Sequence, residues 1–215
     1  PEVTRGDMSA LLASVRLGAA RMEEIAGRFG ADRLASALEQ LLERTRRRVR
    51  ERLAETFDYG THRFTDAIDS DGQGHGPFRL RFALTRAQED GHDVYTFDAR
   101  ETDDQAPGPV NLLMNRGVPG MALGLFYLGG DPTQVCNAGG PQALDHVLFR
   151  EGSLVQPRFP APLGLRGLTM MRALAALNVL VNSAGGTAPA AHSAYVVAML
   201  RGPAGGGPDG TRPFL

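Results

Sequence analysis

The stretch from Asp98 to Asn111 divides this chain of 215 residues into two parts of different character. Its charged residues lead into Pro-Gly-Pro at 107–109. Proline lacks a backbone N–H and restricts the residue before it, so neither a helix nor a strand ladder can run through this point. Before it, apolar and polar residues alternate over 95–99, which predicts the end of a half-buried strand. After it, we predict a buried helix that starts at Val110 and is broken near Pro119.

The first 56 residues show the apolar spacing of two amphipathic helices. Asp7 is a candidate N-cap of the first helix, Gly30 is suited to end it, and Asp32 is a candidate cap of the second. Because only two or three residues connect them, we predict an antiparallel helical hairpin over residues 1–56. The apolar positions are Met8, Leu11, Leu12, Val15, Ala19, Met22, Ala26 and Phe29 in the first helix, and Leu34, Leu38, Leu41, Leu42, Thr45, Val49 and Leu53 in the second.

The remainder, residues 57–215, is predicted to be an α+β region that forms one domain with the hairpin. Its first part is typical of an antiparallel β-meander of three strands, followed by mixed helices and short strands. One of these helices is predicted from Thr169, as N-cap, to Asn182. Helices and strands in separate runs favour an α+β fold over alternating βαβ units. The predicted strands begin at Gly60, Phe78, Val94, Leu144 and Ala194.

All 23 basic residues are arginine, and with 24 acidic residues the net charge is −1. Without lysine there is no P-loop lysine, Schiff-base amine or lysine general base, so this chain cannot hydrolyse nucleotides in the Walker manner. Arginines cluster on the outer face of the second helix from Arg44 to Arg52. Glutamates interleave with them and no aromatic platform is present. We therefore interpret this face as solvated or as a subunit contact, and predict no nucleic-acid partner.

Cys136 is the single cysteine, which excludes an internal disulfide and a multi-cysteine zinc site. The chain opens without an apolar signal region. Its longest apolar run, near Val118 to Leu128, contains Pro and Gly and is too short to span a bilayer. These features predict a cytoplasmic protein with no membrane partner. Neither end has the character of a domain limit, so we expect a piece of a longer polypeptide or a subunit split from one.

The sequence contains no complete set of catalytic groups. The five histidines lie at no metal-ligand spacing from one another, and His75 and His92 are expected to be exposed in loops. Asp145-His146 is the best general-base candidate, although neighbours in a strand point to opposite faces. The acidic clusters at 66–71 and 103–104 lack the pattern of an EF-hand and are explained by turn chemistry. Catalytic residues therefore stay unassigned, and no metal ligand is predicted within this chain.

Six runs occur in an order and spacing shared with one known family. They are Arg5-Gly-Asp-Met-Ser-Ala-Leu-Leu-Ala13 with Arg16, Gly18 and Arg21; Gly60-Thr-His-Arg-Phe-Thr-Asp66 with Asp71-Gly72; Phe97-Asp98 through Gln105-Ala-Pro-Gly-Pro-Val-Asn111; Asn137-Ala-Gly139; Glu151-Gly-Ser-Leu-Val-Gln-Pro157; and Phe159-Pro-Ala-Pro-Leu-Gly-Leu-Arg-Gly-Leu-Thr169. With these runs the chain resembles the hydantoinase B/oxoprolinase family, which includes the matching subunit of acetone-carboxylase-type enzymes. The resemblance covers nearly the whole chain.

The resemblance implies a cytoplasmic heteromer. A hydantoinase A-type subunit uses ATP to phosphorylate the amide or carbonyl oxygen of the substrate, and the B-type subunit takes part in ring hydrolysis or carboxylation. A divalent metal is also implied, held by Asp and His residues in the N-terminal half of the family's chain. That half is absent here, so metal and ATP are expected elsewhere in the complex. Arg150, where the family usually has Pro, and the segment 191–197 depart from the family pattern.

The resemblance thus predicts part of a hydantoinase B-type component of an ATP-dependent cyclic-amide hydrolase or acetone-carboxylase-like complex. We place Asn111, Asn137 and Arg166 nearest its substrate channel, because polar groups in Pro/Gly-rich turns suit a binding site. Capping and turn hydrogen bonds are the alternative role for each. The alternative for the whole chain is a non-catalytic assembly subunit that docks onto a separate metal-bearing partner. In either case we expect no turnover from the chain alone.

Overall fold

The computed structural model describes residues 2–120, 139–185, 200–201 and 213–214. Two long helices precede a mixed four-stranded sheet, and a further helix follows it. This order confirms the predicted α+β class. The elements are α1 (Glu2–Phe29), α2 (Ala31–Thr56), β1 (Gly60–Ile68), β2 (Phe78–Glu89), β3 (His92–Asp98), η1 (Pro141–Ala143), β4 (His146–Leu148), α4 (Arg166–Ser183), β5 (Leu200–Arg201) and β6 (Pro213–Phe214).

β1, β2 and β3 form the predicted antiparallel meander, in the sheet order β1-β2-β3-β4. Leu84 pairs with Phe97, so the two side chains share the inner face of the sheet. β2 and β3 meet in a two-residue turn, in which Asp90 has a φ of 51° and Gly91 a φ of 79°. A tight hairpin needs this left-handed conformation at both positions, which Asp-Gly readily adopts. β4, predicted from Leu144, joins β3 in parallel.

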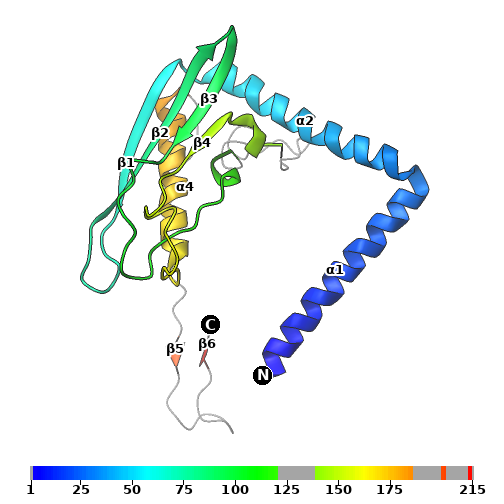
Figure 1. The fold of residues 1–215 in the computed structure, drawn as a ribbon, viewed down its shortest axis with the longest axis horizontal. Coiled ribbons are helices and arrows are strands. Elements are labelled where there is room, and N and C mark those ends of the chain that lie inside the picture. The colour runs from blue at the N-terminus through cyan, green and yellow to red at the C-terminus, as the bar shows by residue number, and fades with distance from the viewer. Residues whose placement is uncertain (1, 121–138, 186–199, 202–212, 215) are drawn as a thin grey trace.

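The core lies between the inner face of the sheet and α4, which crosses that face (Figure 1). Leu80, Phe82 and Phe97 from the strands, and Leu177 and Val181 from α4, have at most 2% of their surface exposed. The apolar residues of α4 point inward because they recur at helical spacing. α4 begins at Arg166 and not at the predicted cap Thr169, whose hydroxyl instead donates to the carbonyl oxygen of Val110.

α1 and α2 meet at Gly30, whose φ of +88° suits a residue without a Cβ. α1 begins at Glu2, so the predicted cap at Asp7 is wrong: the helix runs through that residue. From Gly30 the helices diverge (Figure 1), and the described side chains of α1 are exposed except for the half-buried Ala26. The chain therefore turns where predicted, but the helices do not pack along each other as a hairpin would. We call residues 2–44 the arm and the rest of the described chain the body.

The second half of α2 is anchored to the sheet by an arginine–aspartate pair. Arg86 of β2 donates to the carbonyl oxygens of Ala54 and Phe57 at 2.9 and 2.6 Å. These carbonyls lie at the C-terminal end of α2, where a cation is favourable. The same guanidinium pairs with Asp93 at 2.7 Å, and Asp93 also accepts a hydrogen bond from the hydroxyl of Tyr95. The end of α2 and the β2–β3 hairpin are thus joined through one side chain.

The helix predicted from Val110 is wrong over residues 110–115, which are not helical. The N–H of Leu112 donates to the carbonyl oxygen of Leu154 at 2.9 Å, and that of Met114 to the carbonyl oxygen of Val155 at 3.0 Å. Pairing with a distant segment has outweighed the local apolar pattern. Helical backbone begins only at residue 117. The strand predicted from Ala194 reaches the described residues only at Leu200, and the described helices include none apolar and long enough to cross a membrane.

Candidate functional site

Segments 102–114 and 150–166 are tied together by backbone hydrogen bonds and form what we call the loop junction. It lies beside β2, because the N–H of Asp103 donates to the carbonyl oxygen of Arg79 at 3.0 Å. These bonds fix two Pro/Gly-rich segments that have no regular structure of their own. They run from Leu154 N–H to Asp103 O, from Gln105 N–H to Gly152 O, from Leu112 N–H to Leu154 O and from Leu165 N–H to Pro109 O, each at 2.9 Å.

Asn111 closes the junction from within. Its side chain is fully buried, and Oδ1 accepts the N–H of Ala106 at 2.8 Å. Nδ2 donates to the carbonyl oxygens of Ala106, Gly108 and Pro162 at 2.9 to 3.1 Å. The amide therefore satisfies backbone groups on both segments, which is the turn-bonding role that the sequence left open. Substrate contact by Asn111 stays a prediction.

The second predicted site residue, Arg166, lies near Asn111 because the segment that leads into α4 is bonded to the junction. Its side chain is exposed at the start of α4 and donates to the carbonyl oxygen of Leu163 at 3.2 Å. A guanidinium in this position keeps donors free for a carboxylate or phosphate. Asn137 lies outside the described residues. The structure thus brings two of the three predicted residues to one region, and their contact with substrate stays a prediction.

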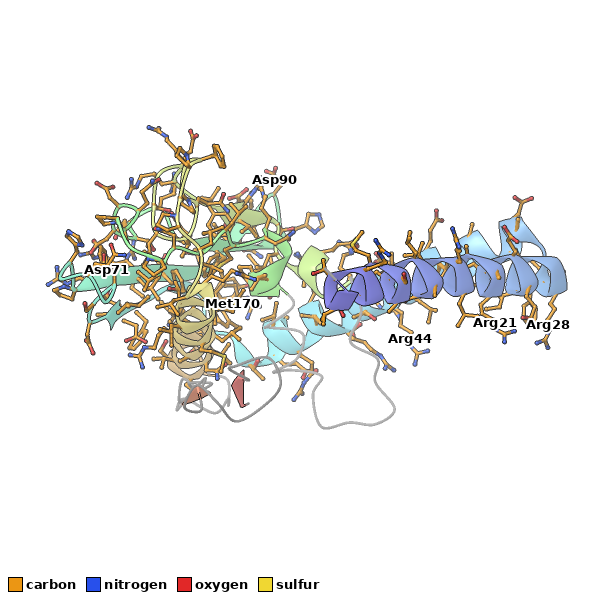
Figure 2. The ribbon with its side chains drawn as sticks, turned by 90° about the horizontal axis from the view of Figure 1, so that it is seen from below. Arg21, Arg28, Arg44, Asp71, Asp90 and Met170 are labelled. Atoms are coloured by element: carbon orange, nitrogen blue, oxygen red, sulfur yellow. The ribbon has the colours of Figure 1, made fainter. Side chains whose placement is uncertain are left out.

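Asp71 reaches the junction from the loop between β1 and β2, at the end of the body remote from the arm (Figure 2). Its carboxylate is fully buried, and Oδ2 lies 2.9 Å from Nδ1 of His75. Burial disfavours its charge, but the N–H groups of Gln73 and His75 and the His75 ring outweigh this and lower the pKa of Asp71. A Cβ on Gly108 would lie 2.5 Å from Oδ2, so glycine permits this approach.

The Asp71–His75 pair was missed from the sequence. His75 is half-exposed as expected, but its carboxylate partner was interpreted only as a turn residue. The Asp-x-x-x-His spacing, with glycines between, was the one signal that could have indicated it. Because Asp71 contacts Gly108, the pair ties the second resemblance run to the third. We interpret it as a loop fastening.

An open depression of about 580 Å³ lies beside the junction. A smaller hollow of about 60 Å³ also includes Arg81 and Glu101 in its wall. Three arginines and three carboxylates line the larger depression, so its charges are balanced and its surface is polar. Its lining residues are Arg81, Arg100, Glu101, Thr102, Asp103, Asp104 and Arg150.

Ion pairs order the wall of this depression. Arg81 pairs with Asp103 at 2.5 Å, and Arg150 with Asp104 at 2.8 Å. Burial opposes the charge of Asp103, but hydrogen bonds from the backbone of Arg79 and from Arg81 lower its pKa. Arg150 also donates to the carbonyl oxygens of Arg100 and Thr102. The residue that departs from the family's usual Pro therefore braces the 100–104 segment.

Several side chains with catalytic potential can be placed among the described residues. Among them no group of three or more His, Cys, Asp or Glu side chains is placed to hold a metal ion. Asp145 accepts hydrogen bonds from Arg50 and from the N–H of Tyr95, so it does not serve as a partner for His146. Ser153 is fully buried, and its hydroxyl has no hydrogen-bond partner within the described part of the chain. The open depression, lined by charged side chains, is suited to a polar ligand or polypeptide.

Comparison with known proteins decides what kind of chain carries this site. The family model for hydantoinase B/oxoprolinase matches residues 1–210. The chain belongs to this family. The B-type subunit of a putative D-/L-hydantoinase from Pseudomonas sp. (strain NS671) is 28% identical over 174 residues, covering 75% of this chain and 28% of that protein.

One solved structure shares the fold of this chain. The crystal structure of ATP-dependent caprolactamase from Pseudomonas jessenii aligns with a TM-score of 0.65 at 19% identity, over 84% of this chain and 30% of that chain. At this identity the likeness shows the fold alone. The chain thus spans less than a third of the length of these relatives.

Four of the six sequence runs that resemble the hydantoinase B family lie close together in space. The runs at 71–72, 97–111, 151–157 and 159–169 meet in the loop junction, through Asp71, Asn111 and the backbone bonds described above. The first run lies in α1. Four of the six runs are therefore parts of one assembly of loops, although about 40 or more residues separate the earlier from the later ones.

Proposed function

We propose that this chain is part of a hydantoinase B-type component that works with an ATP-using hydantoinase A-type subunit to hydrolyse a cyclic amide. The family match over residues 1–210 carries the proposal. The names of the two relatives support the reaction class, since hydantoins and caprolactam are both cyclic amides. ATP and a divalent metal are proposed to be held by the partners, and the complex to work in the cytoplasm.

Ring opening needs water to attack the amide carbon and the amide nitrogen to leave as an amine. Phosphorylation of the amide oxygen by ATP makes that carbon more electrophilic. Once the amine has left, an acyl phosphate remains, and a second water molecule hydrolyses it to the carboxylate and inorganic phosphate. In this scheme the chain contributes one wall of the substrate channel, formed by the loop junction. Arg166 and Asn137 are proposed to bind substrate there, with Arg166 donating to a carboxylate or phosphate oxygen. Asn111 is proposed to lie in the wall of the same channel, where its hydrogen bonds keep the wall in shape.

The test uses the complex isolated from cells through a tag on this chain. Hydantoin, caprolactam and 5-oxoproline are supplied with and without ATP, and acetone with bicarbonate and ATP serves as the carboxylation arm. We expect ATP-dependent ring opening by the complex and none by the 215-residue chain alone. Carboxylation in place of ring opening, or hydrolysis by the isolated chain, contradicts the proposal.

The Arg166→Ala variant tests the channel assignment. Losing one charge-assisted hydrogen bond should raise KM about tenfold, a loss of about 1.4 kcal/mol of binding, with thermal stability unchanged. Arg33→Ala is the matched control, because its exposed side chain lies on α2 in the arm, away from the loop junction. Equal KM values for the two variants would remove Arg166 from the channel.

A non-catalytic assembly subunit is the second candidate, and the exposed apolar face of α1 favours it. In this case a separate chain bears the metal half of the family. Co-purification of such a chain with the tagged protein supports the second candidate. A single longer polypeptide that contains both parts supports the first.

A further inference from the structure

An apolar stripe runs along the arm without cover. The large side chains of the stripe lie 3, 4 or 7 residues apart and so share one side of α1. Val15, near the middle, has 70% of its surface exposed. Figure 2 shows the arm standing clear of the body, with Arg21 and Arg28 on α1. The exposed members of the stripe on α1 are Met8, Leu11, Leu12, Val15, Met22 and Phe29.

The helix α2 also carries an apolar stripe, and the body covers the second half of it. On α2 the same helical spacing includes Leu38 and Leu41, which are exposed, and then Val49 and Leu53, which are buried against the body. Thr45 marks the point where cover begins. The apolar face of α2 is therefore buried in the second half of the helix and uncovered in the first half.

Such a face needs an occupant. Most helical stability in proteins comes from packing an apolar face, and contiguous exposed apolar surface marks an interaction site. The family match begins at residue 1, so the arm is shared by the family and is not an addition of this chain. In both relatives, 70% or more of the chain lies outside the part that aligns with these 215 residues. In these relatives, that additional chain is the candidate cover for the stripe.

We propose that the uncovered stripe of the arm docks on the part of a hydantoinase B-type protein that lies outside these 215 residues, whether that part is on the same polypeptide or a separate one. This inference rests on the function proposed above. The surface it fits is apolar, with carboxylates at its rim. Arg44 and Arg48 lie beside the stripe and make no ion pair with a described residue, so they are free to meet such carboxylates.

Photo-crosslinking in cells tests the docking. The photoreactive residue p-benzoylphenylalanine replaces Val15 in the tagged protein, and crosslinked peptides are identified after isolation of the complex. Ala13→p-benzoylphenylalanine is the matched control: it lies on the same exposed helix, about 200° around the axis from position 15. We expect position 15 to crosslink to a hydantoinase B-type sequence outside these 215 residues, and the crosslink to be lost at position 13.

Each other outcome overturns the docking. A crosslink from position 15 to the same helix of a second copy would make the stripe a homodimer contact. A crosslink to the hydantoinase A-type subunit or to an unrelated protein would assign it to another partner. Equal yields at the two positions, or no crosslink at either, would show that the stripe is not a specific surface.

The enzyme assay separates this inference from the proposed function. A complex that hydrolyses cyclic amides with ATP but gives no crosslink at position 15 refutes the docking alone. A crosslink to the missing hydantoinase B part in a complex without amide hydrolysis refutes the proposed reaction alone.

Discussion

At the residue scale, the side chain of Arg86 connects the C-terminal end of α2 to the β2–β3 hairpin. Its side chain is 10% exposed and contacts two carbonyl oxygens of α2 and the carboxylate of Asp93. It also lies over the ring of Tyr59, with the guanidinium carbon 4.1 Å from the ring centre. Lysine cannot reproduce this fork of donors together with the stacking.

Arg86→Ala should therefore destabilise the chain strongly. It leaves Asp93 without its cation and two carbonyl oxygens of α2 without a donor, at a cost of about 3 kcal/mol. Urea unfolding followed by circular dichroism measures the loss. Arg79→Ala, on the same strand but exposed, should change stability by less than about 0.5 kcal/mol. Similar midpoints for the two variants would contradict the anchoring role.

Tyr95 makes the fold sensitive to alkaline pH. Burial, together with nearby Asp93, raises the pKa of its phenol to about 12. The folded pKa is above the ordinary value of about 10, so the contribution of Tyr95 to stability is complete below pH 10 and is lost as pH rises towards 12. The stability difference between the native chain and Tyr95→Phe should shrink across this window. Phenolate absorbance checks the assignment, since the variant should lack the step near pH 12.

At the scale of elements, the loop junction depends on the direction of one amide. Asn111→Asp keeps the shape but replaces two N–H donors with an oxygen that faces three carbonyl oxygens. A buried charge whose one remaining donor is the N–H of Ala106 should cost at least about 3 kcal/mol. Asn115→Asp is the control, because exposed Asn115 only accepts, from Gly117, and aspartate accepts equally well. Equal unfolding midpoints for Asn111→Asp and Asn115→Asp would contradict this role.

Local sequence patterns correctly predicted those helices and strands whose conformation is decided by residues close in sequence. α2 and the meander follow from apolar spacing and from Asp90-Gly91, and both are where the sequence places them. Segment 110–115 could not be predicted in this way. Its apolar run suits a helix, but carbonyl oxygens more than 40 residues later pair with its N–H groups. Tertiary hydrogen bonds, which no local spacing reports, decide its conformation.

The candidate site was predicted only in outline. Asn111 and Arg166 were selected as polar residues in turns, and the structure brings their segments together. The buried state of Asp71 and the bracing by Arg150 were missed, because each depends on a backbone that arrives from another part of the chain. Asn137 lies outside the described residues, so its place stays a prediction.

At the scale of the whole molecule, the backbone amides of the arm should be less protected from hydrogen exchange than those of the body. Apart from half-buried Ala26, the described side chains of α1 are exposed, whereas Val49 and Leu53 are buried in the core. In the 215-residue chain alone, we expect amides of α1 to exchange with deuterium much faster than those of residues 45–53. Exchange followed by mass spectrometry measures this. Equal protection of the two helices would contradict it.

The loop junction also sets an order for synthesis on the ribosome. The meander joins neighbours in sequence, such as Thr61 with Thr85, 24 residues apart. Asn111 must wait for Pro162, 51 residues later, and Val110 for Thr169, 59 residues later. Closing long loops costs entropy before any bond forms. We therefore expect the hairpins of the nascent chain to form before the side chain of Asn111 finds its carbonyl partners. Those partners become available only when Pro162 and the start of α4 have emerged.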